Sequence, residues 1–399
     1  MRNTLKILKN RFHIYHLFSN TYSILLYLLI TSINAIAAQW NLSFFTIGIL
    51  NFVGALFYVA ASLLFGRIGD RIGQKKVLIF AILLFLFFSV YGFFLSNVVD
   101  LFLFTAGFNF FFGTFFPQIE GLLSKREKEI GIDPVSTVNR FTISWSVGNI
   151  IGVAMGPFLI VKFPYLVFGY GIVLNLISYL ILKKDFARHG ESISFEPSPE
   201  LKKSSNIIDF PKIGLYRTVY RSTYFLLGLI YSAIIPLFPK LISLSGLPIG
   251  ITGFIIVGTN IGVVLTFIFL ERVKSWVGNP KISAIFLAVF PLMTVFIFLS
   301  PSPFIFFVIS FLAGMSYAIP YTYAIFYGLN SQKGDNGKQG GFHEAITGLT
   351  TGIGPLLGGL ALQFANGLMG LGFMSILILA AVFSIQFWFI KRVYARSTI

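Results

Sequence analysis

Long apolar runs, separated by short polar segments, dominate the pattern of this chain. Several runs extend for about 18 residues without a charge, which is the length that an α-helix needs to cross the hydrocarbon core of a bilayer. Strands of a transmembrane barrel would alternate apolar and polar residues instead. The pattern therefore predicts an all-α membrane protein.

Twelve of these runs are long enough to be transmembrane helices. The first six cover residues 18–38, 46–65, 77–95, 101–123, 141–161 and 165–182, and the second six cover 222–238, 249–270, 282–299, 304–327, 345–364 and 371–390. A long polar segment, 183–213, separates the two sets. We expect two six-helix bundles, residues 1–182 and 214–399, joined by a cytoplasmic linker.

The basic residues indicate how the helices are oriented. Lys and Arg number 30 against 14 Asp and Glu, and all of them except Lys162 and Lys240 fall at the termini or in the loops on the same side as the termini. Basic loops stay in the cytoplasm, so we expect a protein of the cell membrane with both termini cytoplasmic. The net charge of +16 therefore gives no reason to expect nucleic acid as a partner.

Composition narrows the chemistry further. Charged residues make up 11% of the chain, whereas soluble domains usually carry about 25%. The absence of cysteine excludes disulfides and thiolate metal sites, and the four histidines lie at or outside the expected membrane edges. We expect no cofactor and no metal.

A short charged segment, GRIGDRIGQKK at residues 66–76, lies between the second and third runs. It carries four basic residues and one acid, Asp70. Residues of this region recur 205 positions later, which indicates an internal duplication. Ser275 occupies the position of the acid in the second copy. The recurring pairs are Gly48 and Gly253, Arg67 and Arg272, Gly73 and Gly278, and Lys76 and Lys281.

This segment resembles the signature of the major facilitator superfamily, Gly-x-x-x-Asp-(Arg/Lys)-x-Gly-x-(Arg/Lys)-(Arg/Lys). The resemblance covers essentially the whole chain. It implies two pseudo-symmetric bundles of six helices that rock about a central cavity, in a transporter that could be of the drug-efflux type. The residues that match the signature are Gly66, Asp70, Arg71, Gly73, Lys75 and Lys76.

A second segment, GNIIGVAMGP in the fifth run, is similar to the glycine-rich motif of antiporters in this superfamily. Glycines spaced by four lie on one helix face and let another helix approach closely. Close packing and a specific antiporter function both stay open as interpretations. The residues are Gly148, Gly152, Gly156 and Pro157. The eleventh run contains a similar glycine-rich pattern with Gly352, Gly354 and Pro355.

The resemblance also implies roles for the charges at the cytoplasmic side. Asp70 is expected to face the positive end of the eleventh helix near residues 341–344 and so to hold the bundles together. Glu120 and Arg140 are expected to form a charge network with Arg71, and Glu344 lies at the edge of the eleventh run.

The basic residues have a simpler interpretation as well. Arg140 and the two lysines of the charged segment, Lys75 and Lys76, could extend to anionic lipid headgroups, and for the two lysines we expect this. No other acid lies deep in a run, and the fourth run lacks a basic residue. Proton coupling therefore stays open, with Glu120 and Asp70 as its candidate sites.

Uncharged residues must then line the cavity. Aromatic rings and amides suit hydrophobic or neutral substrates, through stacking and a few hydrogen bonds. The alternative is that these side chains only pack the helices together. The candidates are Asn34, Asn109, Trp145, Asn149, Tyr224, Tyr231, Asn260, Tyr317 and Tyr321.

Together these observations predict a monomeric secondary transporter that uses alternating access and exports hydrophobic or neutral small molecules. Uniport or symport of a neutral metabolite such as a sugar is the alternative within transport. A non-transporting membrane receptor and a membrane-embedded lipid enzyme are the alternatives of another class. No nucleotide-binding loop of the Gly-x-x-x-x-Gly-Lys type accompanies the runs, which argues against an ATP-driven pump.

Overall fold

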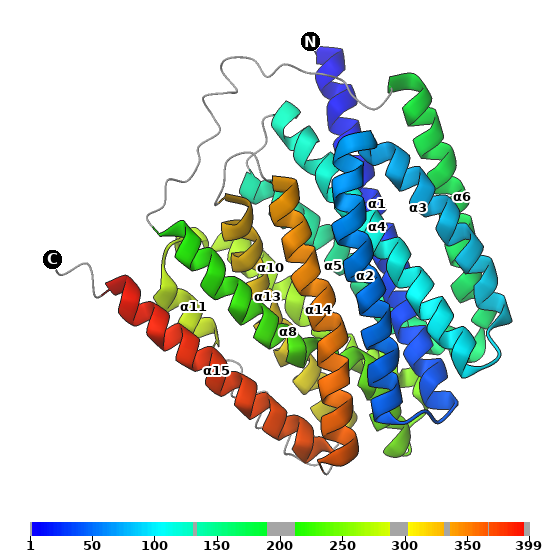
Figure 1. The fold of residues 1–399 in the computed structure, drawn as a ribbon, viewed down its shortest axis with the longest axis vertical. Helices are drawn as coiled ribbons and strands as arrows, with labels where there is room; N and C mark the ends of the chain where they lie inside the picture. The colour runs from blue at the N-terminus through cyan, green and yellow to red at the C-terminus, as the bar shows by residue number, and fades with distance from the viewer. Residues whose placement is uncertain are drawn as a thin grey trace.

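The computed structural model describes residues 2–130, 134–189, 212–287, 302–330, 336–365 and 367–394, and these ranges are almost entirely helical (Figure 1). Within them, eleven helical segments are long and apolar enough to cross a membrane. The expected ninth span, 282–299, begins in α11 (Pro280–Leu287), and the rest of it lies outside the described residues.

Residues 2–189, here called the first half, form six long helices and one short 3-10 helix. α6 continues seven residues past the predicted bundle boundary at 182, and most of the predicted linker lies outside the described residues. The elements are α1 (Arg2–Gln39), α2 (Phe44–Ile72), α3 (Gln74–Tyr91), η1 (Gly92–Phe94), α4 (Val98–Ile130), α5 (Pro134–Lys162) and α6 (Pro164–His189).

Residues 212–394, here called the second half, begin with α8 (Ile213–Leu244). The expected eighth span is divided into η2 (Ile249–Ile251), α9 (Thr252–Ile256) and α10 (Gly258–Arg272). The remaining elements are η3 (Lys274–Trp276), α11, α13 (Pro303–Asn330), α14 (Asn336–Phe364) and α15 (Leu368–Tyr394).

Local chemistry explains where α2 begins and ends. The hydroxyl of Ser43 accepts a hydrogen bond from the backbone N–H of Thr46 at 3.0 Å, which caps the first turn. At the other end the backbone turns sharply into α3 at Gly73, whose φ is 109°. Its counterpart Gly278 also has a positive φ, 75°. Glycine tolerates such angles without steric cost, so the two charged segments share a backbone requirement.

The two halves bury different aromatic residues. Phenylalanines of α3 and α4 form the centre of the first half, where the rings of Phe85 and Phe111 stack at 4.2 Å. Tyrosines of α8 and α13 fill the corresponding part of the second half. The buried tyrosines there are Tyr216, Tyr220, Tyr224, Tyr231, Tyr317, Tyr321, Tyr323 and Tyr327.

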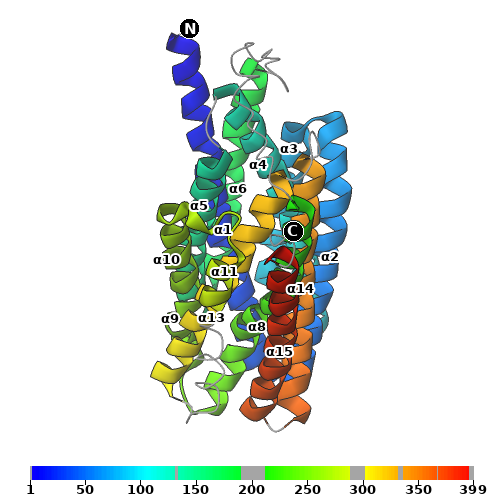
Figure 2. The ribbon, with the colours of Figure 1, turned by 90° about the vertical axis from the view of Figure 1, so that its left-hand side faces the viewer.

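The halves meet along two main lines, α2 against α14 and α5 against α9 and α10 (Figures 1 and 2). Glycines allow α2 and α14 to approach each other closely. A Cβ on Gly48 of α2 would lie 2.7 Å from the carbonyl oxygen of Pro355, and one on Gly359 of α14 would lie 2.5 Å from that of Phe44. Near the same end of the molecule, Lys240 of α8 donates a hydrogen bond to the side chain of Asn41.

Candidate functional site

A cluster of aromatic side chains lies where the two halves meet. The rings of Tyr231 and Tyr317 stack at 4.0 Å with an angle of 15° between their planes. The Tyr224 hydroxyl hydrogen-bonds to the Tyr317 hydroxyl at 3.0 Å, and its ring lies 5.4 Å from that of Tyr321. Helices α8 and α13 supply these four tyrosines, which are all buried. We call them the tyrosine cluster.

The first half completes this cluster from α1 and α5. Trp145 of α5 meets Tyr321 edge-to-face at 5.6 Å. The side chain of Tyr27 in α1 lies near that of Tyr231. Both contacts join the two halves of the chain, so a relative movement of the halves must break or rearrange them.

Two glutamates lie beside the tyrosine cluster. Glu344 of α14 is buried, and Tyr58 of α2 donates a hydrogen bond to its Oε2 at 2.6 Å. Glu120 of α4 is partly buried, and its carboxyl group lies near enough to that of Glu344 for the two to interact electrostatically. The pair therefore connects α4 in the first half with α14 in the second.

His343 lies next to this pair in the chain and is also buried. Its ring stacks on Tyr224 at 5.1 Å and meets Tyr321 edge-on at 4.8 Å. The sequence analysis placed His343 at or outside the membrane edge and did not predict this burial inside the protein. Within the described residues, no group of three or more His, Cys, Asp or Glu side chains could hold a metal ion.

Several polar atoms around the cluster lack hydrogen-bond partners among the described residues. Both ring nitrogens of His343 and both side-chain atoms of the Asn149 amide belong to this group. Asn149 lies one helical turn after Trp145 on α5 and is buried. A buried polar group without a partner is costly, so these atoms call for water or a ligand.

The predicted cavity residues are therefore only partly brought together. Trp145 and the four members of the tyrosine cluster converge, and Asn149 lies one turn away. The three other asparagines make contacts elsewhere. Asn34 and Asn51 exchange hydrogen bonds between α1 and α2, Asn109 bonds to a carbonyl of its own helix, and Asn260 donates to Thr259.

The charged segment at 66–76 is arranged differently from the expectation. Residues 341–344 lie inside α14, so no helix end faces Asp70 there. Asp70 is exposed, and Gln74 of the same segment donates a hydrogen bond to it at 3.4 Å. Within the described residues, neither Arg71 nor Arg140 pairs with Glu120, and both are exposed.

Lys75 also differs from its predicted role at the lipid surface. It is 2% exposed and forms an ion pair with Asp185 of α6 at 2.7 Å, whereas Lys76 is exposed. Gln118 of α4 donates to the carbonyl of Phe65, which holds α2 against α4. The segment is thus tied to neighbouring helices of its own half.

The glycine motif of α5 packs this helix against α1. A Cβ on Gly148 would lie 2.3 Å from the carbonyl oxygen of Asn20, and one on Gly152 would lie 2.5 Å from that of Ile24. Gly156 continues the row, whereas Pro157 lies near Gly250 of the second half. In α14, Gly352 faces α2 and Gly354 faces α8, on either side of the helix that contains Pro355. These glycines serve close packing.

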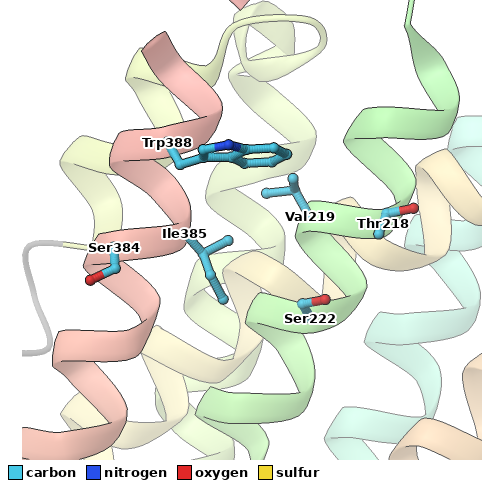
Figure 3. Close-up of a pocket in the computed structure, with 6 residues that line it drawn as sticks. All are labelled: Thr218, Val219, Ser222, Ser384, Ile385 and Trp388. Carbon is cyan, nitrogen blue, oxygen red and sulfur yellow. The ribbon is translucent and has the colours of Figure 1, made fainter. Parts of the chain in front are cut away.

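A separate groove of about 360 Å³ lies between α8 and α15 (Figure 3). Val219 and Ile385 line its apolar wall, and the Trp388 ring lies at one end of it. None of its lining residues belongs to the tyrosine cluster or to the glutamate pair. It is therefore a feature of the second half alone.

The sequence analysis missed four residues of the site: Tyr27, Tyr58, His343 and Asp185. Tyr27 and Tyr58 could have been found because each is a tyrosine in an otherwise apolar run. His343 directly precedes an acid that had been noted, but only the packing of α14 on α8 buries it. Nothing local marks Asp185 as a partner of Lys75, because 110 residues separate them.

Comparisons with known proteins agree with this architecture. The family model described as Major Facilitator Superfamily matches residues 17–329. The chain therefore belongs to the major facilitator superfamily, and it is a multi-pass membrane protein of a transporter family. A comparison with curated proteins gives no match.

Solved structures share the fold at low sequence identity. The nucleoside transporter NupG superposes with a TM-score of 0.64 at 14% identity, covering 97% of this chain and 99% of that one. Tetrameric PepTSo2 gives 0.69 at 13% identity, with 98% and 100% covered. A bacterial homolog of the human lysosomal transporter Spinster, in an inward-facing and unoccupied conformation, gives 0.68 at 13% identity, with 95% and 97% covered. At such identity the likeness concerns the fold.

Proposed function

We propose that this chain is a secondary transporter that exports neutral or hydrophobic small molecules by alternating access between two six-helix bundles. The observation that carries the proposal is the tyrosine cluster together with Trp145, because both halves contribute to it. A molecule bound among these rings would contact both halves at once. Movement of one half against the other would then expose it to alternate sides of the membrane.

The chemistry of the cluster supports a substrate with a flat or apolar ring. Tyrosine and tryptophan offer large apolar faces for stacking, and their hydroxyl and N–H groups add a few directional contacts. The unpartnered amide of Asn149 and ring nitrogens of His343 would supply hydrogen bonds to such a substrate. A purely apolar ligand would leave these amide and ring atoms without hydrogen bonds. A substrate that carries some polar atoms therefore fits best.

The unpartnered polar atoms also favour the second candidate function, uptake of a neutral metabolite. The α5 glycines pack α5 against α1 in this structure and carry no information about direction. We propose the cell membrane as the location, with both termini in the cytoplasm, because the basic residues lie almost entirely on one side. We further propose that the protein works as a monomer.

Flux into liposomes tests the proposal. The purified full-length protein, reconstituted in both orientations, should transport a neutral aromatic dye or a neutral sugar faster than empty liposomes do. Replacing Trp145 with alanine should reduce this flux strongly, because the ring contacts the second half from the first. Trp388→Ala in the groove between α8 and α15 is the matched control and should retain flux.

Two outcomes would count against transport. Flux equal to that of empty liposomes for every compound tested would favour a receptor. Equal losses in the Trp145→Ala and Trp388→Ala proteins would remove the tyrosine cluster as the substrate site. The direction of transport follows from the side of the membrane on which a one-sided inhibitor blocks flux.

A further inference from the structure

We infer that Asn149 of α5 and Asn260 of α10 form a binding site for a neutral aromatic primary carboxamide, a flat ring that carries one uncharged CO–NH₂ group. This inference rests on the proposed function, because it names the class of substrate that a site between the halves would take. The tyrosine cluster and Trp145 alone would accept many flat molecules. The two buried amides add the directional contacts that select one class among them.

The two asparagines lie at the same level of the contact between the halves. Helix α5 packs along both α9 and α10 (Figure 2). At one end of this contact, a Cβ on Gly253 would meet the carbonyl oxygens of Val153 and Ala154. At the other end, the rings of Phe267 and Trp145 meet at 6.0 Å. Residue numbers therefore rise along one helix as they fall along the other, and position 260 lies opposite position 149.

Helical spacing turns both asparagines toward this contact. Asn260 follows Gly253 by seven residues, which is close to two turns, so the two share one helix face. Val257 joins α9 to α10 with helical backbone angles, φ −57° and ψ −21°, and this face continues through the joint. Asn149 follows Trp145 by about one turn and shares its face. Both asparagines are buried, at 1% and 0% exposure.

The two amides leave three atoms without hydrogen-bond partners among the described residues. Both side-chain atoms of Asn149 are open, so this amide offers a donor and an acceptor side by side. The Nδ2 of Asn260 donates to the Thr259 hydroxyl at 3.1 Å, and that hydroxyl donates to the carbonyl of Ile256 at 2.7 Å. Because the hydroxyl is already a donor, it accepts from the N–H₂ of Asn260, and this leaves Oδ1 of Asn260 as the open atom.

A primary carboxamide complements these three atoms. It has one acceptor oxygen and two N–H donors, whereas the site offers one N–H₂ group and two acceptor oxygens. The ligand's oxygen and the N–H beside it can form two parallel hydrogen bonds with Asn149, and its second N–H can donate to Oδ1 of Asn260. A carboxylate or an ester has no donor for the two oxygens, and an ammonium group has no acceptor for the N–H₂ of Asn149.

The ring of such a ligand would lie toward Trp145. Four residues rise about 6 Å along a helix, so a ring attached directly to the carboxamide reaches the level of Trp145 from that of Asn149. The Trp145 ring meets Tyr321 of the second half at 5.6 Å, and aromatic faces of this kind stack on flat rings. The ligand would thus contact both halves twice, through its amide and through its ring.

Binding of benzamide to the purified full-length protein tests the inference, with ligand-observed NMR titration as the measurement. N,N-dimethylbenzamide keeps the ring and the oxygen but has no N–H donor, so it should bind about tenfold more weakly than benzamide. Isoindolin-1-one holds the amide in a second ring and keeps the oxygen and the N–H beside it. It lacks the second N–H and should bind with intermediate affinity.

Alanine variants assign the contacts to residues and leave room for the ligand. Asn149→Ala should weaken benzamide about tenfold and abolish its preference over N,N-dimethylbenzamide, because the donor and the acceptor that pair with the carboxamide are gone. Asn260→Ala should weaken benzamide but not isoindolin-1-one, which lacks the N–H that reaches Asn260. A purely structural role of either asparagine would not change the preference among ligands.

Asn175→Ala is the matched control. Asn175 of α6 is also 1% exposed, but both of its side-chain atoms are bonded inside the first half, to the Tyr22 hydroxyl and to the carbonyl of Gly171. This variant should keep the wild-type order of the three ligands. Should an alanine variant fail to fold, the three ligands on the wild-type protein still test the inference.

The possible results separate this inference from the proposed function. Equal affinity of the wild type for benzamide and N,N-dimethylbenzamide would overturn the carboxamide site and would mean that water pairs with the two amides. A preference that persists in both Asn149→Ala and Asn260→Ala would overturn it as well. The expected preference without flux of any compound would overturn transport and leave the site in place. Flux of a dye or a sugar without this preference would do the reverse.

Discussion

Apolar rings fill the centre of the first half, and its charged segment is held by an ion pair, whereas tyrosine hydroxyls take the corresponding places in the second half. At the first charged segment, Lys75 is paired with Asp185. At the second, Gly278 is fixed by two tyrosines: Tyr216 donates to its carbonyl at 3.0 Å, and its N–H donates to the hydroxyl of Tyr327 at 2.8 Å. The two glycines share a positive φ, as the predicted internal duplication requires, and the two halves stabilise the turn with different chemistry.

This difference bears on the proposed substrate site. A phenylalanine core offers dispersion contacts without direction, while a tyrosine cluster fixes its rings through hydrogen bonds and presents polar atoms. The Tyr224 hydroxyl, for example, bonds to both Tyr317 and Thr347. We therefore propose that the second half supplies most of the contacts to a substrate and that Trp145 of the first half completes them.

The largest effect on stability should come from the phenylalanine core. Phe111 is fully buried and contacts Phe85, Phe115 and Tyr22. Phe111→Ala should lower the free energy of unfolding by about 3 kcal/mol, because its neighbours lose their packing contacts. Thermal unfolding of the purified protein measures this. Phe87→Ala, at a position 66% exposed, should unfold close to the wild type, and equal shifts in the two variants would contradict the assignment of the core.

The buried ion pair should give the next largest effect. Lys75→Met removes the ion pair with Asp185 and should cost about 2 kcal/mol of stability, less than loss of a fully buried pair, because Asp185 keeps 20% exposure. Lys76→Met, at an exposed neighbouring position, should have little effect. A double variant with Asp185→Asn should recover much of the loss. A chain in which both lysines behave alike would show that the pair contributes nothing.

The tyrosines bonded to Gly278 in the second charged segment should contribute to stability through their hydroxyl groups. Tyr327→Phe keeps the ring but removes the acceptor of the Gly278 N–H, which should cost about 1 kcal/mol. Comparison with Phe111→Tyr sharpens the contrast, since that variant adds a hydroxyl to a region filled by apolar rings. Both variants should unfold at a lower temperature than the wild type. A Tyr327→Phe protein as stable as the wild type would mean that the hydroxyls do not hold the turn.

The smallest effect on stability is expected for Asp70→Asn. Asp70 is exposed and accepts one long hydrogen bond, so the unfolding temperature should not change. Its proposed role as a gate concerns other states of the transport cycle, and a flux assay addresses it. We expect a reduction in flux smaller than that caused by Trp145→Ala. Unchanged flux would remove Asp70 from the gating mechanism.

Much of the site could be foreseen from residue type and helical register. Tyr317 and Tyr321 lie one turn apart and Tyr224 and Tyr231 seven residues apart, so each pair lies on one face of its helix. The asparagines were less predictable, because an amide can bond within its own helix, as Asn109 does, or across to a neighbour, as Asn34 does. Composition cannot distinguish these two choices.

Charges were the least predictable part of the site. Opposite charges at helix ends on one side of the membrane suggested a network of Glu120 with Arg140 and Arg71. Packing instead brings Glu120 of α4 near Glu344 of α14, and these two helices are in contact. The rotation of a helix about its axis decides which neighbour a side chain meets, and rotation depends on contacts along the whole helix.

The sequence by itself determined the class of this protein and the membrane helices seen in the described residues, and it marked Gly73 and Gly278 as corresponding positions. These follow from local properties: runs of apolar residues, helix-capping groups and backbone angles that glycine allows. Only the tertiary structure decided that Lys75 pairs with Asp185, that His343 is buried and that Glu120 and Glu344 from different halves lie near each other. Such contacts depend on the distance between helices far apart in the chain, which close packing sets and no local pattern encodes.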